Sequence, residues 1–129
     1  MDQTASVLLD LIKSSLWGTP LPDYDSLYDE PVDWDAVFEE AKIQTVAGIA
    51  APAVPDSAPA ELRSKWKTYS YQILANYHKV LAAQDQLLAL LAEHNIPVAI
   101  LKGAAAAIYY PNPSQRNMGD IDFLVTQKL

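Results

Sequence analysis

Two acidic residues separated by one position lie near the end of the chain. Asp120 and Asp122 alternate with the apolar residues Ile121, Phe123 and Val125, which is the period of a strand with one buried face. Such a strand would place both carboxylates side by side on its opposite face. Neighbouring carboxylates repel each other unless a cation lies between them, and Mg²⁺ prefers oxygen ligands and leaves room for substrate phosphates. Asp120 and Asp122 are therefore predicted to be metal ligands.

Residues upstream of this strand could bind an anion. The aliphatic run 97–101 is typical of a buried strand, and the alanine-rich run 104–109 is a strong helix former. Lys102 and Gly103 lie between them. A glycine at a strand-to-helix turn lets backbone N–H groups approach a ligand closely, and the start of a helix favours anions. The sequence therefore predicts an anion site and a cation site joined by one short helix, the pair that a metal–nucleoside triphosphate requires.

The loop between the short helix and the acidic strand adds further candidates. Pro111 and Pro113 end the helix, and Ser114 and Arg116 follow. Arg116 is predicted either to bind a phosphate through two hydrogen bonds or to brace the aspartates as an ion pair. Ser114 is a further candidate for a phosphate contact. Lys102 either reaches a phosphate as a point charge or is solvated or paired with a nearby acid.

Together these residues resemble the signature of a known family. The likeness is carried by Leu101-Lys102-Gly103, Tyr110-Pro111, Arg116 and the run 119–125. Over residues 96–126 the pattern is similar to that of the uncharacterised nucleotidyltransferase family of the DNA polymerase β superfamily. The resemblance implies a polymerase β-like core and transfer of a nucleoside monophosphate from an NTP to an unknown acceptor. It further implies Mg²⁺ or Mn²⁺ as the cofactor, with the aspartates as catalytic metal ligands and the glycine turn on the phosphates.

The chain departs from the superfamily pattern at two points. Gly103 is followed by Ala104 where serine or glycine is usual, so a hydroxyl contact to phosphate is absent. A third carboxylate is expected on a later strand, whereas the sequence stops at Leu129. We therefore expect the N-terminal part of a longer enzyme, with a truncated core and an incomplete sheet, that is inactive alone.

The elements that must position these residues are mostly helical. Apolar residues at i, i+3 and i+4 predict helices over 4–17, 34–46 and 60–93, with Asp33 as the N-cap of the second. The stripe of the third helix consists of Leu62, Trp66, Tyr69, Ile73, Tyr77, Val80, Leu87 and Leu91. The predicted fold class is α/β or α+β, with a helical N-terminal region over 1–95. Residues 96–129 are predicted to form a β–α–β unit, which would be the start of a nucleotidyltransferase core.

Two segments between these helices are predicted to be irregular. The acidic stretch 21–32 lacks the glycine and closing glutamate of an EF-hand, so it reads as a solvated connector rather than a Ca²⁺ loop. Gly48 and the prolines at 52, 55 and 59 make a breaker-rich segment, which could link two subdomains but is apolar enough to pack against a neighbour.

Composition limits the classes of protein and of partner. The chain has 129 residues, half of them hydrophobic, which suits one globular domain. Its net charge of −7 argues against broad electrostatic binding of nucleic acid, although a local site with its metal could hold a nucleotide. The absence of cysteine excludes disulfides and thiolate catalysis. No run approaches the ~20 apolar residues of a membrane span, so we expect a soluble, cytoplasmic protein without a membrane partner.

Alternatives remain open at this point. An incomplete sheet exposes unpaired N–H and C=O groups, so we expect either a homodimer, formed through the last strand or the long helix, or an edge covered by the N-terminal helices. Two other functions fit the same residues. One is a non-catalytic module whose long helix recruits a partner, and the other is a degenerate nucleotide-binding protein that senses NTP without turning it over.

Overall fold

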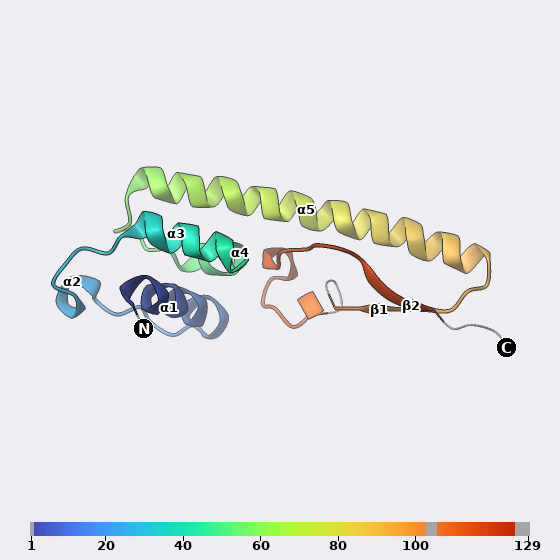
Figure 1. Ribbon diagram of the computed structural model, residues 1–129, viewed down its shortest axis with the longest axis horizontal. Coiled ribbons are helices and arrows are strands. Elements are labelled where there is room, and N and C mark those ends of the chain that lie inside the picture. Colours follow the sequence, from blue (N-terminus) through green and yellow to red (C-terminus); the bar gives the residue numbers. More distant parts are fainter. Residues whose placement is uncertain (1, 103–105, 126–129) are drawn as a thin grey trace. The chain divides into compact units, whose positions relative to one another are not determined.

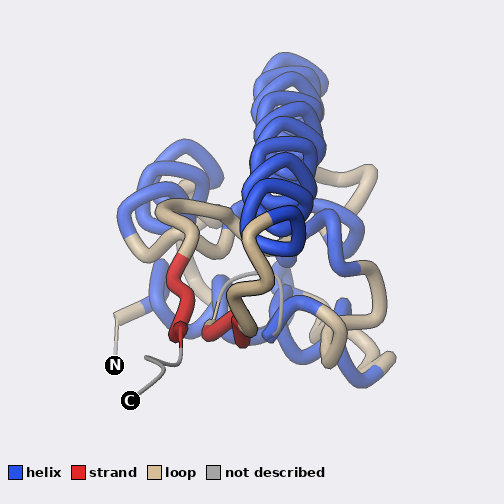
Figure 2. The backbone as a smooth tube through the Cα atoms, turned by 90° about the vertical axis from the view of Figure 1, so that its right-hand side faces the viewer, coloured by secondary structure: helices blue, strands red, loops and turns tan. Residues whose placement is uncertain are grey.

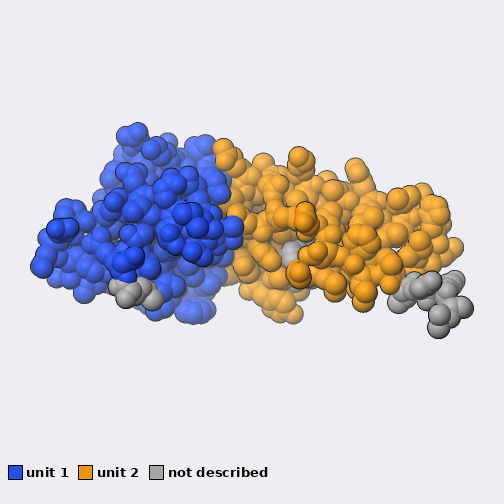
Figure 3. Space-filling model, in the orientation of Figure 1, with its two compact units in different colours: residues 1–71 blue, residues 72–129 orange. Residues whose placement is uncertain are grey.

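A computed structural model describes residues 2–102 and 106–125. The chain divides into two compact units, residues 1–71 and 72–129 (Figure 3), and the long helix α5 (Ala60–Glu93) contributes residues to both. Helices and an antiparallel pair of strands make up the regular structure of the described residues. The predicted α+β class is therefore confirmed. The predicted boundary between 95 and 96 stays a prediction.

Unit 1 contains α1 (Gln3–Trp17), which forms where the apolar spacing predicts it (Figure 1). The side chain of Asp2 caps its start by accepting a hydrogen bond from the backbone N–H of Ala5 at 2.7 Å. Gly18 ends the helix in the left-handed region, with φ of 70°, a conformation that glycine adopts without steric cost. The buried face consists of Val7, Leu8 and Leu11.

The third helix of unit 1, α3 (Trp34–Ile43), begins as predicted and ends early. The carboxylate of Asp33 accepts a hydrogen bond from the N–H of Ala36 at 3.1 Å, which confirms the predicted N-cap. The expected continuation to Val46 is wrong. The backbone turns into the left-handed region at Thr45, with φ of 58°, and a helix cannot continue through such a residue.

The acidic stretch 21–32 is not wholly irregular, because it contains the one-turn helix α2 (Tyr24–Leu27). The side chain of Asp23 caps this helix. The hydroxyl of Tyr24 donates to the carboxylate of Asp10 at 3.1 Å, and its ring stacks on that of Tyr28. Burial, together with the charge of Asp10, raises the pKa of the Tyr24 phenol. The turn is thus held by contacts to residues outside it, which local composition does not reveal.

The expected breaker segment is likewise partly helical. It contains α4 (Ala47–Ala50) and the 3₁₀ helix η1 (Ala51–Ala53). Gly48 is buried within α4 instead of ending a helix. Pro52 lies in the first turn of η1, where a missing N–H removes no helical hydrogen bond.

Trp66 of α5 is the central side chain of unit 1. Its indole N–H donates to the carbonyl of Ala47 at 2.8 Å, and its ring lies 5.1 Å from that of Phe38 between centroids. Only 1% of its surface is exposed. A single side chain therefore ties the start of α5 to α3 and α4.

Replacing this side chain tests its importance to unit 1. We expect Trp66→Phe to lower the free energy of unfolding by roughly 1–2 kcal/mol, because the indole hydrogen bond and part of the buried ring are lost. Chemical denaturation followed by circular dichroism measures the change. Trp17 is 72% exposed, so the control Trp17→Phe should change stability by less than about 0.5 kcal/mol. Equal losses in the two variants would contradict the packing described here.

Unit 2 contains the rest of α5, β1 (Val98–Leu101), the 3₁₀ helix η2 (Pro113–Gln115) and β2 (Asp122–Val125). The ribbon of β1 and β2 lies alongside this part of α5 (Figures 1 and 2). The predicted bounds of the long helix are confirmed. Every residue of its predicted stripe is buried or half-buried: Leu62, Trp66, Tyr69, Ile73, Tyr77, Val80, Leu87 and Leu91.

The two strands pair antiparallel, with Val98 opposite Val125 at one end and Leu101 opposite Asp122 at the other. The last residue of β1, Leu101, pairs with Asp122, so the ladder of paired residues does not reach Asp120. The strand predicted over 120–125 therefore begins at Asp122, two residues later than predicted. The predicted apolar face of β2 is also only partly covered, since Phe123 is 44% exposed.

The described core of unit 2 is small. It consists of Ile73 on α5, Ala107 in the helical turn after β1 and Met118 just before the acidic pair.

Within the described ranges, no helix combines the length and the apolar character that crossing a bilayer requires.

Candidate anion and cation site

Strand pairing brings the turn after β1 next to the acidic residues. Because Leu101 lies opposite Asp122, the following residue, Lys102, is adjacent to Asp122. The ammonium Nζ of Lys102 lies 3.7 Å from Oδ2 of Asp122. The two side chains are 77% and 45% exposed, so this ion pair contributes at most about 1 kcal/mol. The register of the ribbon, and not the ion pair, accounts for their proximity.

Lys102 has an unusual backbone conformation. Its φ is 46°, in the left-handed region that costs an L-residue roughly 1–2 kcal/mol. Its carbonyl accepts a hydrogen bond from the N–H of Ala106 at 3.3 Å. The strand β1 ends at Leu101, and the chain is helical at Ala106 and Ala107. The residues described before and after positions 103–105 therefore agree with the predicted change from strand to helix. Gly103 lies outside the described residues, so its phosphate-binding role stays a prediction.

The two predicted metal ligands differ in their surroundings. Asp122 is half-buried at the start of β2, and Asp120 is exposed in the irregular segment before it. Carboxylate oxygens suit Mg²⁺, which commonly binds one or two of them and completes its shell with phosphates and water. In the described ranges, no group of three His, Cys, Asp or Glu side chains is placed to hold a metal ion. Metal binding by Asp120 and Asp122 therefore stays a prediction.

A side chain that the sequence did not single out holds the segment before the aspartates. The amide of Asn76 on α5 donates to the carbonyl of Met118 at 2.7 Å, and Met118 is 8% exposed. This bond fixes the backbone two residues ahead of Asp120. Asparagine is a poor helix former. Its presence within a long predicted helix was the one weak indication in the sequence that the side chain at position 76 makes a specific contact.

Of the loop candidates, Ser114 lies within η2 and Arg116 directly follows it. The hydroxyl of Ser114 donates to Oδ1 of Asn112 at 2.7 Å, and the Ser114 N–H donates to the same oxygen at 3.1 Å. Arg116 is half-buried. Its Nη1 donates to the carbonyl of Asn117 at 3.4 Å, and its buried Nε has no hydrogen-bond partner among the described residues.

Within the described ranges, Arg116 is not in an ion pair with either aspartate. Among the described residues the ion pairs are Lys42–Glu39, Arg63–Asp56 and Lys102–Asp122. The expected ion pair between Arg116 and the aspartates is therefore not formed in the described part of the chain. The phosphate interpretation of Arg116 stays a prediction.

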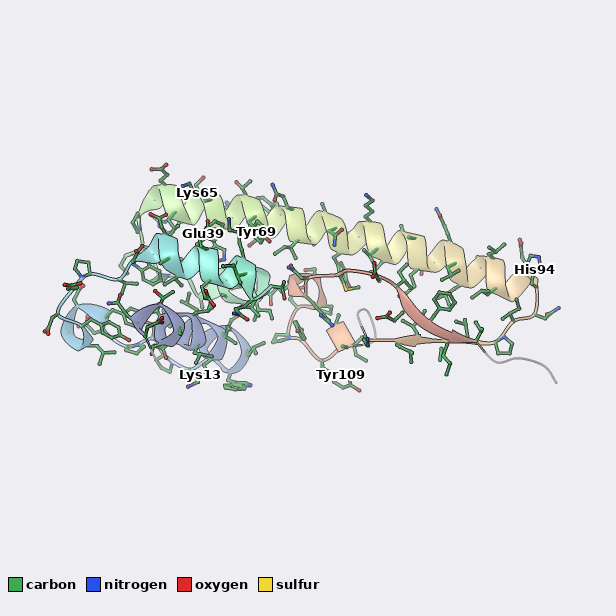
Figure 4. All side chains as sticks on the ribbon, in the orientation of Figure 1. Lys13, Glu39, Lys65, Tyr69, His94 and Tyr109 are labelled. Atoms are coloured by element: carbon green, nitrogen blue, oxygen red, sulfur yellow. The ribbon has the colours of Figure 1, made fainter. Side chains whose placement is uncertain are left out.

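The surface beyond the turn is apolar. Tyr109, which is 85% exposed, projects from the end of the short helical turn away from α5 (Figure 4). Its neighbour Ile108 is 69% exposed. Both side chains are therefore largely open to solvent.

Two substitutions at Lys102 separate backbone strain from charge. Both Lys102→Gly and Lys102→Ala remove the ammonium, but only glycine relieves the left-handed conformation. We expect the glycine variant to be more stable than the alanine variant by about 1 kcal/mol. Urea denaturation of the two proteins measures this difference. At an ordinary φ the order would be reversed, with glycine about 0.5–1 kcal/mol less stable, and that result would contradict the geometry.

Comparison with known proteins extends the resemblance found in the sequence. A family model described as uncharacterised nucleotidyltransferase matches residues 30–128. The match confirms the predicted resemblance over 96–126 and reaches upstream to include α3 and α5. Comparisons with curated proteins and with solved structures give no match.

Proposed function

The chain belongs to the uncharacterised nucleotidyltransferase family, and we propose that its acidic pair and its Lys102-Gly103 turn form part of a Mg²⁺-dependent nucleotidyl transfer site. The substrate would be an NTP, and a nucleoside monophosphate would pass to an acceptor hydroxyl with release of pyrophosphate. One observation supports this most directly. The Lys102 ammonium and the Asp122 carboxylate lie 3.7 Å apart at one end of the ribbon. A metal–triphosphate needs a negative group for its metal and a positive group for its phosphates, and these two side chains would supply them.

The aspartates would hold the metal. Asp120 and Asp122 supply carboxylate oxygens, and the triphosphate and water supply the remaining ligands of Mg²⁺ or Mn²⁺. When bound, the ion neutralises charge that develops on the transferring phosphoryl group. The half-buried position of Asp122 strengthens its interaction with a cation relative to a fully solvated carboxylate.

The other candidates would bind phosphate. Lys102 carries a compact charge on a flexible stem, and the Gly103 turn would offer backbone N–H groups. The guanidinium of Arg116 is suited to two parallel hydrogen bonds to phosphate oxygens. Ser114 has a smaller role, because its hydroxyl proton already goes to Asn112 and phosphate oxygens require donors.

The net charge bears on the acceptor and on the location. At −7 the chain repels the nucleic acid backbone, which favours a small molecule or a protein hydroxyl as the acceptor. We further propose a cytoplasmic location, where an NTP substrate would be available.

Loss of the carboxylates tests the proposal. We expect Asp120→Asn and Asp122→Asn each to weaken binding of Mg²⁺–NTP by about tenfold or more, because each removes a charged oxygen ligand. Isothermal titration calorimetry with each of the four NTPs measures the affinity. Asp85 is an exposed residue of α5, and the control Asp85→Asn should bind as the wild type does.

Two results would count against transfer at this site. Unchanged affinity in both aspartate variants would remove the metal site. In a longer form of the protein that supplies the expected third carboxylate, binding of Mg²⁺–NTP without release of pyrophosphate would instead indicate the nucleotide-sensing alternative.

A further inference from the structure

We infer that Lys102 acts as an exchangeable counter-ion for Asp122, an inference that rests on the proposed function. Its ammonium neutralises the carboxylate until metal and triphosphate arrive together, and it then moves to the phosphates. A free divalent ion must compete with Lys102, whereas a metal–nucleotide complex offers Lys102 a new partner. The site therefore discriminates against metal alone and in favour of metal–nucleotide.

The contact itself requires this competition. Lys102 Nζ lies 3.7 Å from Oδ2 of Asp122, and Mg²⁺ binds carboxylate oxygens at about 2.0–2.1 Å. An ammonium and a divalent cation cannot share one carboxylate oxygen at these distances without strong repulsion. A metal on Oδ2 would therefore compete with Lys102 for that oxygen.

The exposure of Lys102 makes the exchange feasible. Its side chain is 77% exposed, so packing does not hold the ammonium in place. The stem has four carbons and ends in three rotatable donors, and it can change partners without a fixed geometry. The exchange costs little, because exposed ion pairs change affinities by no more than about fivefold.

The backbone at Lys102 is a second, independent observation. A lysine with φ of 46° occupies a conformation that glycine or asparagine adopts at lower cost. Strained residues of this kind persist where the surrounding structure holds them and are concentrated at ligand-binding sites. Here the strained residue directly follows β1 and carries the charge that pairs with Asp122. One residue thus combines the backbone turn with the exchanging charge.

Charge removal should shift two affinities in opposite directions. In Lys102→Gln the competition for Asp122 is lost, so Mn²⁺ alone should bind about two- to fivefold more tightly. The same variant loses a phosphate contact, so tripolyphosphate in saturating Mg²⁺ should bind several-fold more weakly. Isothermal titration calorimetry measures both affinities, with Mn²⁺ titrated in the absence of phosphate.

Two further variants serve as controls. Lys102→Arg keeps the positive charge and should bind Mn²⁺ as the wild type does. Lys79 is an exposed lysine of α5, and Lys79→Gln makes the same charge change away from the acidic pair. It should leave both affinities unchanged, which separates a local effect from a change in net charge.

The outcomes distinguish this inference from the function on which it rests. A fall of both affinities in Lys102→Gln would indicate a merely structural residue and would overturn the exchange. Weaker tripolyphosphate binding with unchanged Mn²⁺ affinity would leave Lys102 as a phosphate ligand and also overturn it. If the wild type binds neither Mn²⁺ nor Mg²⁺–NTP, the proposed function itself fails.

Discussion

The candidate site depends on the register in which β1 and β2 pair. Leu101 lies opposite Asp122, so the turn that leaves β1 and the segment that enters β2 meet at one end of the ribbon. A slip of one residue would send the side chain of Asp122 to the other face and would move it away from Lys102. Both the anion-binding and the cation-binding hypotheses therefore need this register.

Charge alone does not maintain the arrangement. The Lys102–Asp122 pair is largely exposed and too weak to hold two segments together. Burial of Ala107 and Met118 and the hydrogen bond from Asn76 to the Met118 carbonyl fix the chain on either side of the loop. The charged side chains are consequently free to change partners while the backbone stays in place. The exchange of partners proposed for Lys102 requires that combination.

The sequence predicted the parts of the fold that depend on local spacing. Apolar residues at helical intervals determine α1 and α5, and the side chain of Asp33 caps α3 as its residue type suggests. The family resemblance also followed from a local pattern and is confirmed by the match over residues 30–128.

The features that the sequence did not predict depend on contacts between distant residues. Alternation placed the start of the second strand at Asp120, but the ladder ends where β1 ends, and that partner is not visible in the local pattern. The one-turn helix α2 is held by the bond from Tyr24 to Asp10. The left-handed conformation of Lys102 and the contact of Asn76 belong to the turn and to the packing of unit 2, which residue types alone do not specify.

The central claim is that a divalent ion binds between the acidic pair and the turn after β1. Mn²⁺ and an NTP are titrated together, without Mg²⁺, into isotopically labelled protein. Paramagnetic broadening of the amide signals in NMR spectra then locates the ion directly. We predict that the signals of Leu101, Lys102, Asp120 and Asp122 broaden first. Broadening that begins instead in the acidic stretch 21–32, or that affects all exposed acids alike, would contradict the account.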